Sequence, residues 1–169
     1  MSLRNKMLVG ATVAVVGVVY GGLAFGSVVF NGTDSLPHNG YFMLRVAIEP
    51  PKGAYVSFKA PSVVAEEFQS LSFVKRVEGT VGDVVSSMDG TVCVNGECRD
   101  LLPKLREHGI AALGSQVIPE GFVAVFGDSA NSLDSRYDAV GLVSVDDIEA
   151  VGFPIPVPHW KTLVDWMAQ

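Results

Sequence analysis

The stretch Phe73-Val-Lys75-Arg-Val-Glu-Gly-Thr-Val-Gly82-Asp83 shows how this chain builds its fold and where it places an unusual charge. Its first residues form a strand-like run, and its glycines then end that strand. Because side chains of a strand point alternately to opposite faces, Lys75 shares a face with Phe73 and Val77. The stretch therefore predicts a strand that places an amine in apolar surroundings. An edge lysine that reaches solvent along its stem is the ordinary alternative.

Short runs of the same type lie on both sides of this stretch. Turn residues such as Pro50-Pro51 and Pro119-Glu-Gly121 separate them. The predicted strands are residues 41–47, 54–59, 73–77, 83–88, 91–94, 122–126 and 140–145. A helix is expected at residues 63–71 after an N-cap at Ser62, and residues 101–115 form a short helix or an irregular excursion. The pattern predicts a mainly β fold, a twisted and partly closed antiparallel domain with few short helices, and not a parallel α/β sheet.

The two cysteines, Cys93 and Cys98, flank a predicted hairpin turn at Asn95-Gly96. Cysteines on either side of such a turn can approach within disulfide range, and a disulfide would imply an oxidising compartment. Free thiols are the alternative. A metal site would need further ligands close by, and the nearest histidine is His108. We expect a Cys93–Cys98 disulfide, no metal and no cofactor.

The N-terminal segment accounts for the high apolar content of this chain, whose 169 residues are 49% hydrophobic with a mean hydropathy of +0.36. No residue between Lys6 and Asn31 is charged, and residues 7–30 would span ~36 Å as a helix, enough to cross a hydrocarbon core of ~30 Å. Arg4 and Lys6 precede the run, which favours a cytoplasmic N-terminus. The predicted parts are a cytoplasmic segment at 1–6, a transmembrane anchor at 7–30 and an extracytoplasmic domain at 31–169. A signal sequence cleaved near Ala24-Phe25-Gly26 is the alternative.

The charge of the chain excludes one class of partner. Its formal net charge is -6, its pI is about 4.9, and its 12 Lys and Arg residues are scattered along the sequence. Binding to phosphate backbones requires clustered positive charge, so we expect no nucleic-acid partner.

Two further polar patches occur on either side of the 73–83 stretch in the sequence. One is Asn31-Gly-Thr-Asp-Ser35-Leu-Pro37, and the other is Phe126-Gly-Asp128-Ser-Ala-Asn-Ser132-Leu-Asp134-Ser-Arg136-Tyr. In residue types, order and spacing, the three patches resemble the conserved boxes of the type I signal peptidase family, which are serine proteases with a Ser–Lys dyad. The matches are Ser35-Leu36-Pro37 to the nucleophile box, Lys75 through Asp83 to the lysine box, and Gly127-Asp128 with Ser132 through Arg136 to the third box.

The resemblance implies roles for the residues in these boxes. Ser35 corresponds to the nucleophile and Lys75 to the general base. The expected oxyanion donors are the backbone N–H of Ser35 and the hydroxyl of Thr33, and Ser132 is expected to orient the lysine. Three residues are expected to support the site without reacting, namely Asp134 and Arg136 as a structural ion pair, and Asp128.

The physical chemistry of lysine agrees with this assignment. A serine hydroxyl becomes a good nucleophile when a neighbouring base takes its proton, and lysine is such a base only when it is neutral. The reference pKa of lysine is about 10.4, and burial among apolar neighbours lowers it by up to ~3–5 units. The apolar face predicted for Lys75 supplies that burial.

The form of the nucleophile box, with Gly40-Tyr41 following Ser35-Leu36-Pro37, is similar to the conjugative-transfer branch of the family, as are the small size and single anchor. Members of that branch process pilin precursors, and some join the trimmed ends into a ring. The resemblance implies a serine endopeptidase of the bacterial inner membrane, with its catalytic domain on the periplasmic face, that cleaves an exported pilin precursor near the bilayer surface. A general housekeeping signal peptidase and a non-catalytic, membrane-anchored scaffold of a pilus or secretion assembly are the alternatives.

Overall fold

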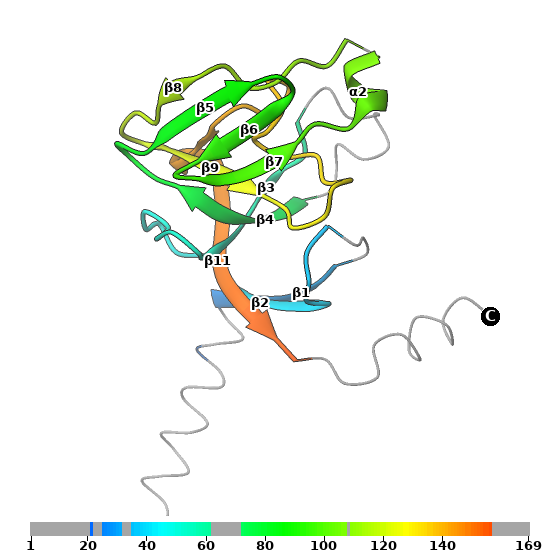
Figure 1. The fold of residues 1–169 in the computed structure, drawn as a ribbon. Coiled ribbons are helices and arrows are strands. Elements are labelled where there is room, and N and C mark those ends of the chain that lie inside the picture. Colours follow the sequence, from blue (N-terminus) through cyan, green and yellow to red (C-terminus); the bar gives the residue numbers. More distant parts are fainter. Residues whose placement is uncertain (1–20, 22–24, 32–34, 62–71, 108, 157–169) are drawn as a thin grey trace, which may run out of the picture.

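The fold consists of two antiparallel β-sheets, seen in a computed structural model that describes residues 21, 25–31, 35–61, 72–107 and 109–156 (Figure 1). The larger sheet has the strand order β1-β2-β11-β3-β4-β9-β10, and the smaller has the order β7-β6-β5-β8. The elements are β1 (Gly26–Phe30), β2 (Gly40–Leu44), β3 (Tyr55–Lys59), β4 (Ser72–Gly79), β5 (Val84–Met88), β6 (Thr91–Val94), β7 (Glu97–Asp100), α2 (Pro103–Glu107), β8 (Gln116–Val117), β9 (Phe122–Phe126), β10 (Val143–Ser144), a 3-10 helix (Val145–Asp147) and β11 (Ile148–Ile155). The prediction of a mainly β, antiparallel fold with few short helices is confirmed.

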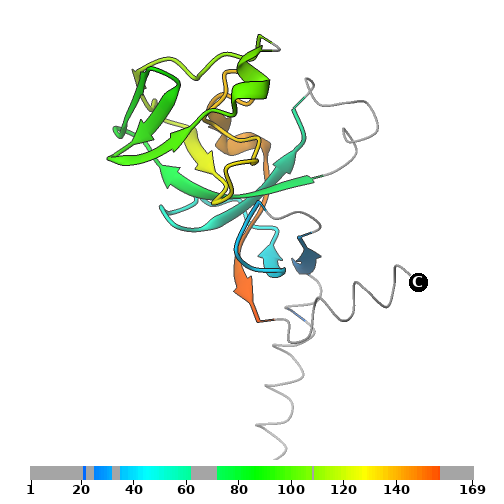
Figure 2. The same cartoon turned by 45° about the vertical axis from the view of Figure 1, so that its right-hand side comes forward.

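The apolar side chains of the larger sheet divide between its two faces. One face carries a core cluster that includes Val56, Val77 and Val125, all fully buried. The other face carries a cluster that includes Tyr41 and Met43 of β2, also fully buried. Figures 1 and 2 place β1 and β2 at the end of the molecule remote from the smaller sheet.

Strand β11 is the main element that the sequence analysis missed. It lies in the middle of the larger sheet, where it pairs with β2 on one side and β3 on the other. Gly152 and Pro154 interrupt its β pattern in the sequence, but both pair with β2, Gly152 with Met43 and Pro154 with Tyr41. A Cβ atom on Gly152 would collide with the backbone oxygen of Phe42 and lie 2.9 Å from Cα of Met43. The close approach of two backbones therefore explains this glycine.

The boundaries of two predicted segments need correction. Residues 26–30, which we assigned to the end of the anchor, form strand β1, because Val28 and Val29 pair with Phe42 and Tyr41 of β2. The predicted strand 140–145 is reduced to β10, and the 3-10 helix follows it. The anchor up to residue 20 and the helix at 63–71 lie outside the described residues. Within the described ranges, no helix has the length and apolar character needed to cross a membrane.

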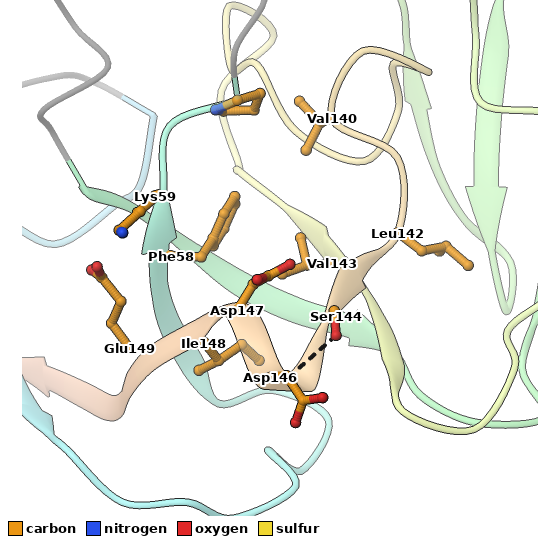
Figure 3. A pocket seen from close by; sticks show the side chains of 11 residues that line it. Phe58, Lys59, Val140, Leu142, Val143, Ser144, Asp146, Asp147, Ile148 and Glu149 are labelled. Atoms are coloured by element: carbon orange, nitrogen blue, oxygen red, sulfur yellow. Dashed lines mark hydrogen bonds between the residues drawn. The ribbon is translucent and has the colours of Figure 1, made fainter.

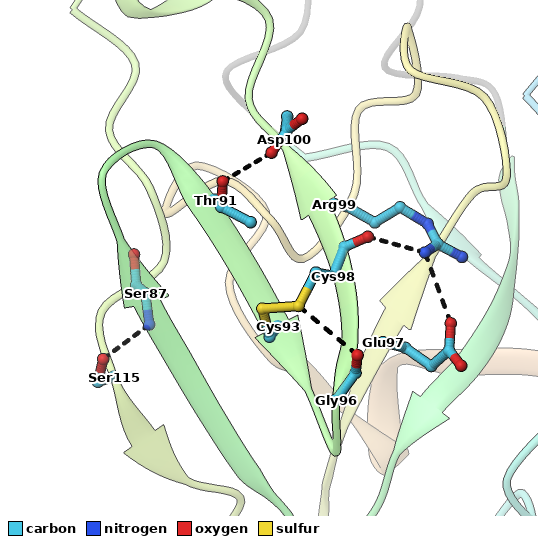
Figure 4. Close-up of a disulfide and its surroundings, with 9 residues drawn as sticks. All are labelled: Ser87, Thr91, Cys93, Gly96, Glu97, Cys98, Arg99, Asp100 and Ser115. Atoms are coloured by element: carbon cyan, nitrogen blue, oxygen red, sulfur yellow. Dashed lines mark hydrogen bonds and ion pairs between the residues drawn. A yellow bond between two sulfur atoms is a disulfide. The ribbon is translucent and has the colours of Figure 1, made fainter.

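The smaller sheet contains the predicted hairpin, formed by β6 and β7. Asn95 and Gly96 have φ values of 51° and 88°, the left-handed conformation that a tight turn of this kind requires. Cys93 and Cys98 are directly opposite each other in the register, and their sulfur atoms are bonded at 2.04 Å (Figure 4). Next to this bond, Arg99 donates to the backbone oxygen of Cys98 at 2.9 Å.

Candidate active site

Lys75 lies in the middle of β4 and is 5% exposed. Val56 of β3 is its partner in the register, and its amine lies 5.3 Å from the centre of the Phe73 ring. Burial lowers the pKa of Lys75 to about 8, while the charge of Asp134 opposes this shift and that of Arg136 adds to it. A substantial fraction of the amine is therefore neutral near pH 8.

The register between β4 and β9 identifies what lies opposite this lysine. Arg76 pairs with Phe126 and Val77 pairs with Val125, so continuing the register by one residue places Lys75 opposite Gly127. A Cβ atom on Gly127 would collide with Oγ of Ser132 and lie 2.8 Å from the backbone oxygen of Ser35. Paired residues project to the same face of a sheet. Lys75, Ser132 and the backbone of Ser35 therefore gather above Gly127.

Hydrogen bonds from the neighbouring loop hold the backbone of Ser35. Its carbonyl oxygen accepts the N–H of Asp128 at 2.8 Å and the N–H of Ser129 at 3.3 Å. The next residue, Leu36, is buried in the cluster that contains Tyr41. Ser35 itself is half-buried. Its position is thus set by loop contacts on one side and by core packing on the other, whereas Thr33 lies outside the described residues.

Ser132 is 2% exposed, and its hydroxyl oxygen has no hydrogen-bond partner among the described residues. A buried polar group without a partner costs about 1–3 kcal/mol. Such groups are rare in folded proteins and occur at sites where a reacting group or an ordered water completes the bonding. The hydroxyl of Ser132 is therefore available to a lysine amine on the same side of the sheet.

The predicted ion pair between Asp134 and Arg136 is present and fully buried. Nε and Nη2 of Arg136 lie 2.8 Å and 2.9 Å from the two carboxylate oxygens of Asp134. The backbone N–H of Gly127 also donates to Asp134, at 2.8 Å. The remaining donors of Arg136 reach the backbone oxygens of Asp100, Ala130, Gly127 and Ser129. This network fixes the loop that carries Ser132 and that binds the backbone of Ser35.

Asp128 belongs to a different charge cluster from the one that contains Asp134. Its carboxylate oxygen lies 3.0 Å from Nη2 of Arg76, and the same nitrogen lies 3.3 Å from Oε2 of Glu78. The sequence analysis quoted Arg76 and Glu78 within the lysine box but gave them no role. Because side chains of a strand alternate, both residues lie on the face of β4 opposite Lys75, and the sequence alone could have predicted this. The sequence analysis also quoted Gly127, but it did not show that a side chain there would collide with Ser132 and Ser35.

A separate cavity of about 520 Å³ lies between the end of β3 and the β10–β11 region (Figure 3). Phe58 and Val143 contribute apolar surface to its lining, and Asp146, Asp147 and Glu149 contribute carboxylates. Neither Ser35 nor Lys75 lines this cavity, so we place the chemistry above Gly127 instead. In the described part of the chain, no cluster of three His, Cys, Asp or Glu residues is suited to hold a metal ion.

Comparisons with known proteins show the family to which the chain belongs. Residues 3–155 match the family described as signal peptidase, peptidase S26, and the chain therefore belongs to this family of serine peptidases. The probable thylakoidal processing peptidase 2, chloroplastic, of Arabidopsis thaliana is 32% identical over 93 residues, which cover 52% of this chain and 24% of that protein. The chain thus spans about a quarter of the length of this curated relative. A crystal structure of a signal peptidase I from Enterococcus faecalis V583 covers 62% of this chain and 97% of its own at 23% identity, with a TM-score of 0.38.

Proposed function

We propose that the chain is a membrane-bound serine endopeptidase in which Ser35 is the nucleophile and Lys75 the general base. The observation that carries this proposal is the burial of Lys75 on the side of the sheet where Ser132 and the backbone of Ser35 meet above Gly127. Membership of the signal peptidase family supports the same chemistry. Since signal peptidases act on exported precursor proteins, the substrate class is a precursor cut outside the cytoplasm.

The proposed reaction has two stages. Neutral Lys75 accepts the proton of the Ser35 hydroxyl while the oxygen attacks the scissile carbonyl, and the same amine then protonates the leaving nitrogen. The developing oxyanion accepts hydrogen bonds from the backbone N–H of Ser35 and the hydroxyl of Thr33. Ser132 orients the amine of Lys75. Water activated by Lys75 releases the acyl group, and a substrate amine in place of water would form a new peptide bond.

A matched pair of serine variants tests this proposal. The full chain is expressed with an exported precursor, and mass spectrometry measures the fraction of the precursor that is cut. We expect Ser35→Ala to abolish cleavage, whereas Ser129→Ala, which keeps the backbone N–H bound to Ser35, should retain it. Equal cleavage by wild type and Ser35→Ala would contradict the proposed peptidase activity and favour a non-catalytic scaffold.

The finer part of the proposal concerns location and substrate. The uncharged run after Arg4 and Lys6 supports a single anchor in a bacterial inner membrane, with the catalytic domain on the periplasmic face. Ser35-Leu36-Pro37 and the small size of the chain support a pilin precursor as the substrate. Mass spectrometry of a co-expressed pilin precursor reports the cut site, and a product lighter by one water than the trimmed chain indicates ring closure. A housekeeping peptidase would instead process many precursors.

A further inference from the structure

Glu78 is the extra residue of a β-bulge in strand β4. Val77 pairs with Val125 of β9, but the next pair is Gly79 with Ala124, so the register shifts across Glu78. Bulges of this kind redirect a side chain and are frequent beside active sites. In this chain, the extra residue carries a carboxylate that is 4% exposed and that lies on the same face as Arg76.

The carboxylate of Glu78 meets Arg76, which it shares with Asp128. Nη2 of Arg76 lies 3.0 Å from Oδ1 of Asp128 and 3.3 Å from Oε2 of Glu78. Oε2 of Glu78 has no hydrogen-bond partner within the described residues. One guanidinium nitrogen therefore contacts two carboxylates, and its contact with Asp128 is the shorter one.

Asp128 connects this cluster to the proposed nucleophile. Its backbone N–H donates to the carbonyl oxygen of Ser35 at 2.8 Å, while its carboxylate is held by Arg76. A change in the contacts of Arg76 with the two carboxylates therefore acts on the residue whose backbone holds Ser35. Lys75, the neighbour of Arg76 in β4, points to the opposite face. Consecutive residues of β4 thus face the two sides of the sheet, Lys75 toward Gly127 and Arg76 toward Asp128.

We propose that Glu78 is a positioning residue for the peptidase reaction, which competes with Asp128 for Arg76 and so sets how firmly the backbone of Ser35 is held. The inference rests on the proposed function. When Glu78 is ionised, it draws Arg76 toward itself and balances the pull of Asp128. When Glu78 is neutral, Arg76 pairs with Asp128 alone. The ionisation of one buried carboxyl group therefore changes the placement of the nucleophile.

The surroundings of Glu78 explain why its ionisation is adjustable. Burial raises the pKa of Glu78 above its usual value, whereas the positive charges of Arg76 and Arg99 lower it and the negative charges of Glu97 and Asp128 raise it. Arg99 and Glu97 belong to β7, and Asp128 follows β9. A buried carboxylate with an incomplete set of partners contributes little to stability, so its role is more readily understood at the active site.

The competition is tested first without any substrate. The pKa of Glu78 is measured by carbon NMR of the full chain, labelled at glutamate and solubilised in detergent, with Glu78→Gln identifying the resonance. Asp128→Asn and Glu97→Gln each remove one nearby negative charge, so both lower the pKa of Glu78. We expect the larger shift with Asp128→Asn, because it also releases Arg76 to Glu78. If Asp128→Asn shifts the pKa of Glu78 no more than Glu97→Gln does, the proposed competition for Arg76 is wrong.

Kinetics then test the positioning role. At pH 9, where Lys75 is largely neutral, Glu78→Gln should lower kcat by about three- to tenfold with KM and melting temperature unchanged, because a misplaced nucleophile slows chemistry without altering substrate contacts. In wild type, log kcat/KM should show an acid inflection that Glu78→Gln lacks, and Glu97→Gln should retain it. An unchanged kcat, or a fall in kcat matched by a fall in melting temperature, would overturn the role. Failure of wild type to cleave any precursor would instead refute the proposed function, and the NMR titration would still decide the competition.

Discussion

Arg136 and Lys75 are both buried basic residues beside the same loop, but they differ in the number of partners that surround them. Arg136 is 1% exposed and has a bidentate carboxylate partner and four backbone acceptors. Lys75 is 5% exposed and forms no ion pair with any described residue. The hydroxyl of Ser132, on its side of the sheet, is also without a partner in the described ranges. The loop therefore supplies a full set of partners to Arg136 and leaves Lys75 without an ion pair among the described residues, as the proposed base requires.

This difference is consistent with the chemistry of the two cations. A guanidinium keeps its charge at all relevant pH values, so burying it requires a full set of acceptors. An amine can lose its proton, and burial without a carboxylate partner makes that loss easier. A carboxylate in direct contact with Lys75 would stabilise its ammonium form and weaken the proposed base. Asp134 instead binds Arg136, which is consistent with Lys75 as the proposed base.

Breaking the Arg136 pair should have the largest effect on the molecule. Asp134→Ala leaves a buried guanidinium without its partner, and we expect the free energy of unfolding to fall by about 3–5 kcal/mol. Denaturant unfolding measures this change. Asp128→Ala breaks a half-exposed pair and should cost about 1 kcal/mol or less, which makes it the matched control. Similar losses for the two variants would show that burial does not distinguish these pairs.

The contrast also predicts how activity depends on pH. Because Lys75 must be neutral to act and burial lowers its pKa to about 8, kcat/KM should rise about tenfold per pH unit below that value and level off above it. Between pH 6 and pH 8 the change is about 50-fold, because half of the amine is still protonated at pH 8. Steady-state cleavage of a fixed peptide across this range measures it. A flat profile from pH 6 to pH 9 would exclude Lys75 as the base.

The same group gives a stability effect with a defined sign. The pKa of Lys75 is lower in the folded chain than the ordinary value of 10.5, so the unfolded state binds more protons between about 8 and 10.5. Stability contributed by this group therefore rises with pH through that window and is lowest below it. Variants that replace Lys75 should lack this rise of stability with pH.

The extent to which the sequence predicted this molecule depends on the range of the contacts involved. Strand runs such as 54–59 and the hairpin turn at Asn95-Gly96 are local patterns, and the structure contains both. Strand β11 was missed because its place between β2 and β3 depends on partners about 100 residues away, while Gly152 and Pro154 resemble breaks in a strand. Pairing of this kind has no signal within the strand itself.

The site shows the same limit. The boxes gave Ser35, Lys75 and the Asp134–Arg136 pair as candidates, and the pair is present in the structure. The link from Glu78 through Arg76 to Asp128 could not be predicted, because it depends on a register shift in β4 and on a backbone hydrogen bond between distant loops. The sequence named Asp128 as a supporting residue, but it did not show that the partner of its carboxylate is Arg76.

The last prediction compares two hydroxyls of one loop, one proposed to orient Lys75 and one that supports the structure. Ser132 and Ser135 are both buried, but Oγ of Ser135 accepts the N–H of Val125 at 3.0 Å, whereas Oγ of Ser132 has no partner in the described structure. Removing a satisfied acceptor leaves a buried N–H unpaired, so Ser135→Ala should lower the free energy of unfolding by about 1–3 kcal/mol.

Ser132→Ala should behave in the opposite way. It removes an unsatisfied polar atom, so thermal unfolding should show little or no loss of stability. The amine of Lys75 would lose its orienting hydroxyl, and kcat should fall about tenfold, the equivalent of one hydrogen bond to a group that becomes charged. Measuring kcat and melting temperature for both variants decides the matter. If Ser132→Ala loses stability and keeps its kcat, this hydroxyl supports the loop and does not serve the base.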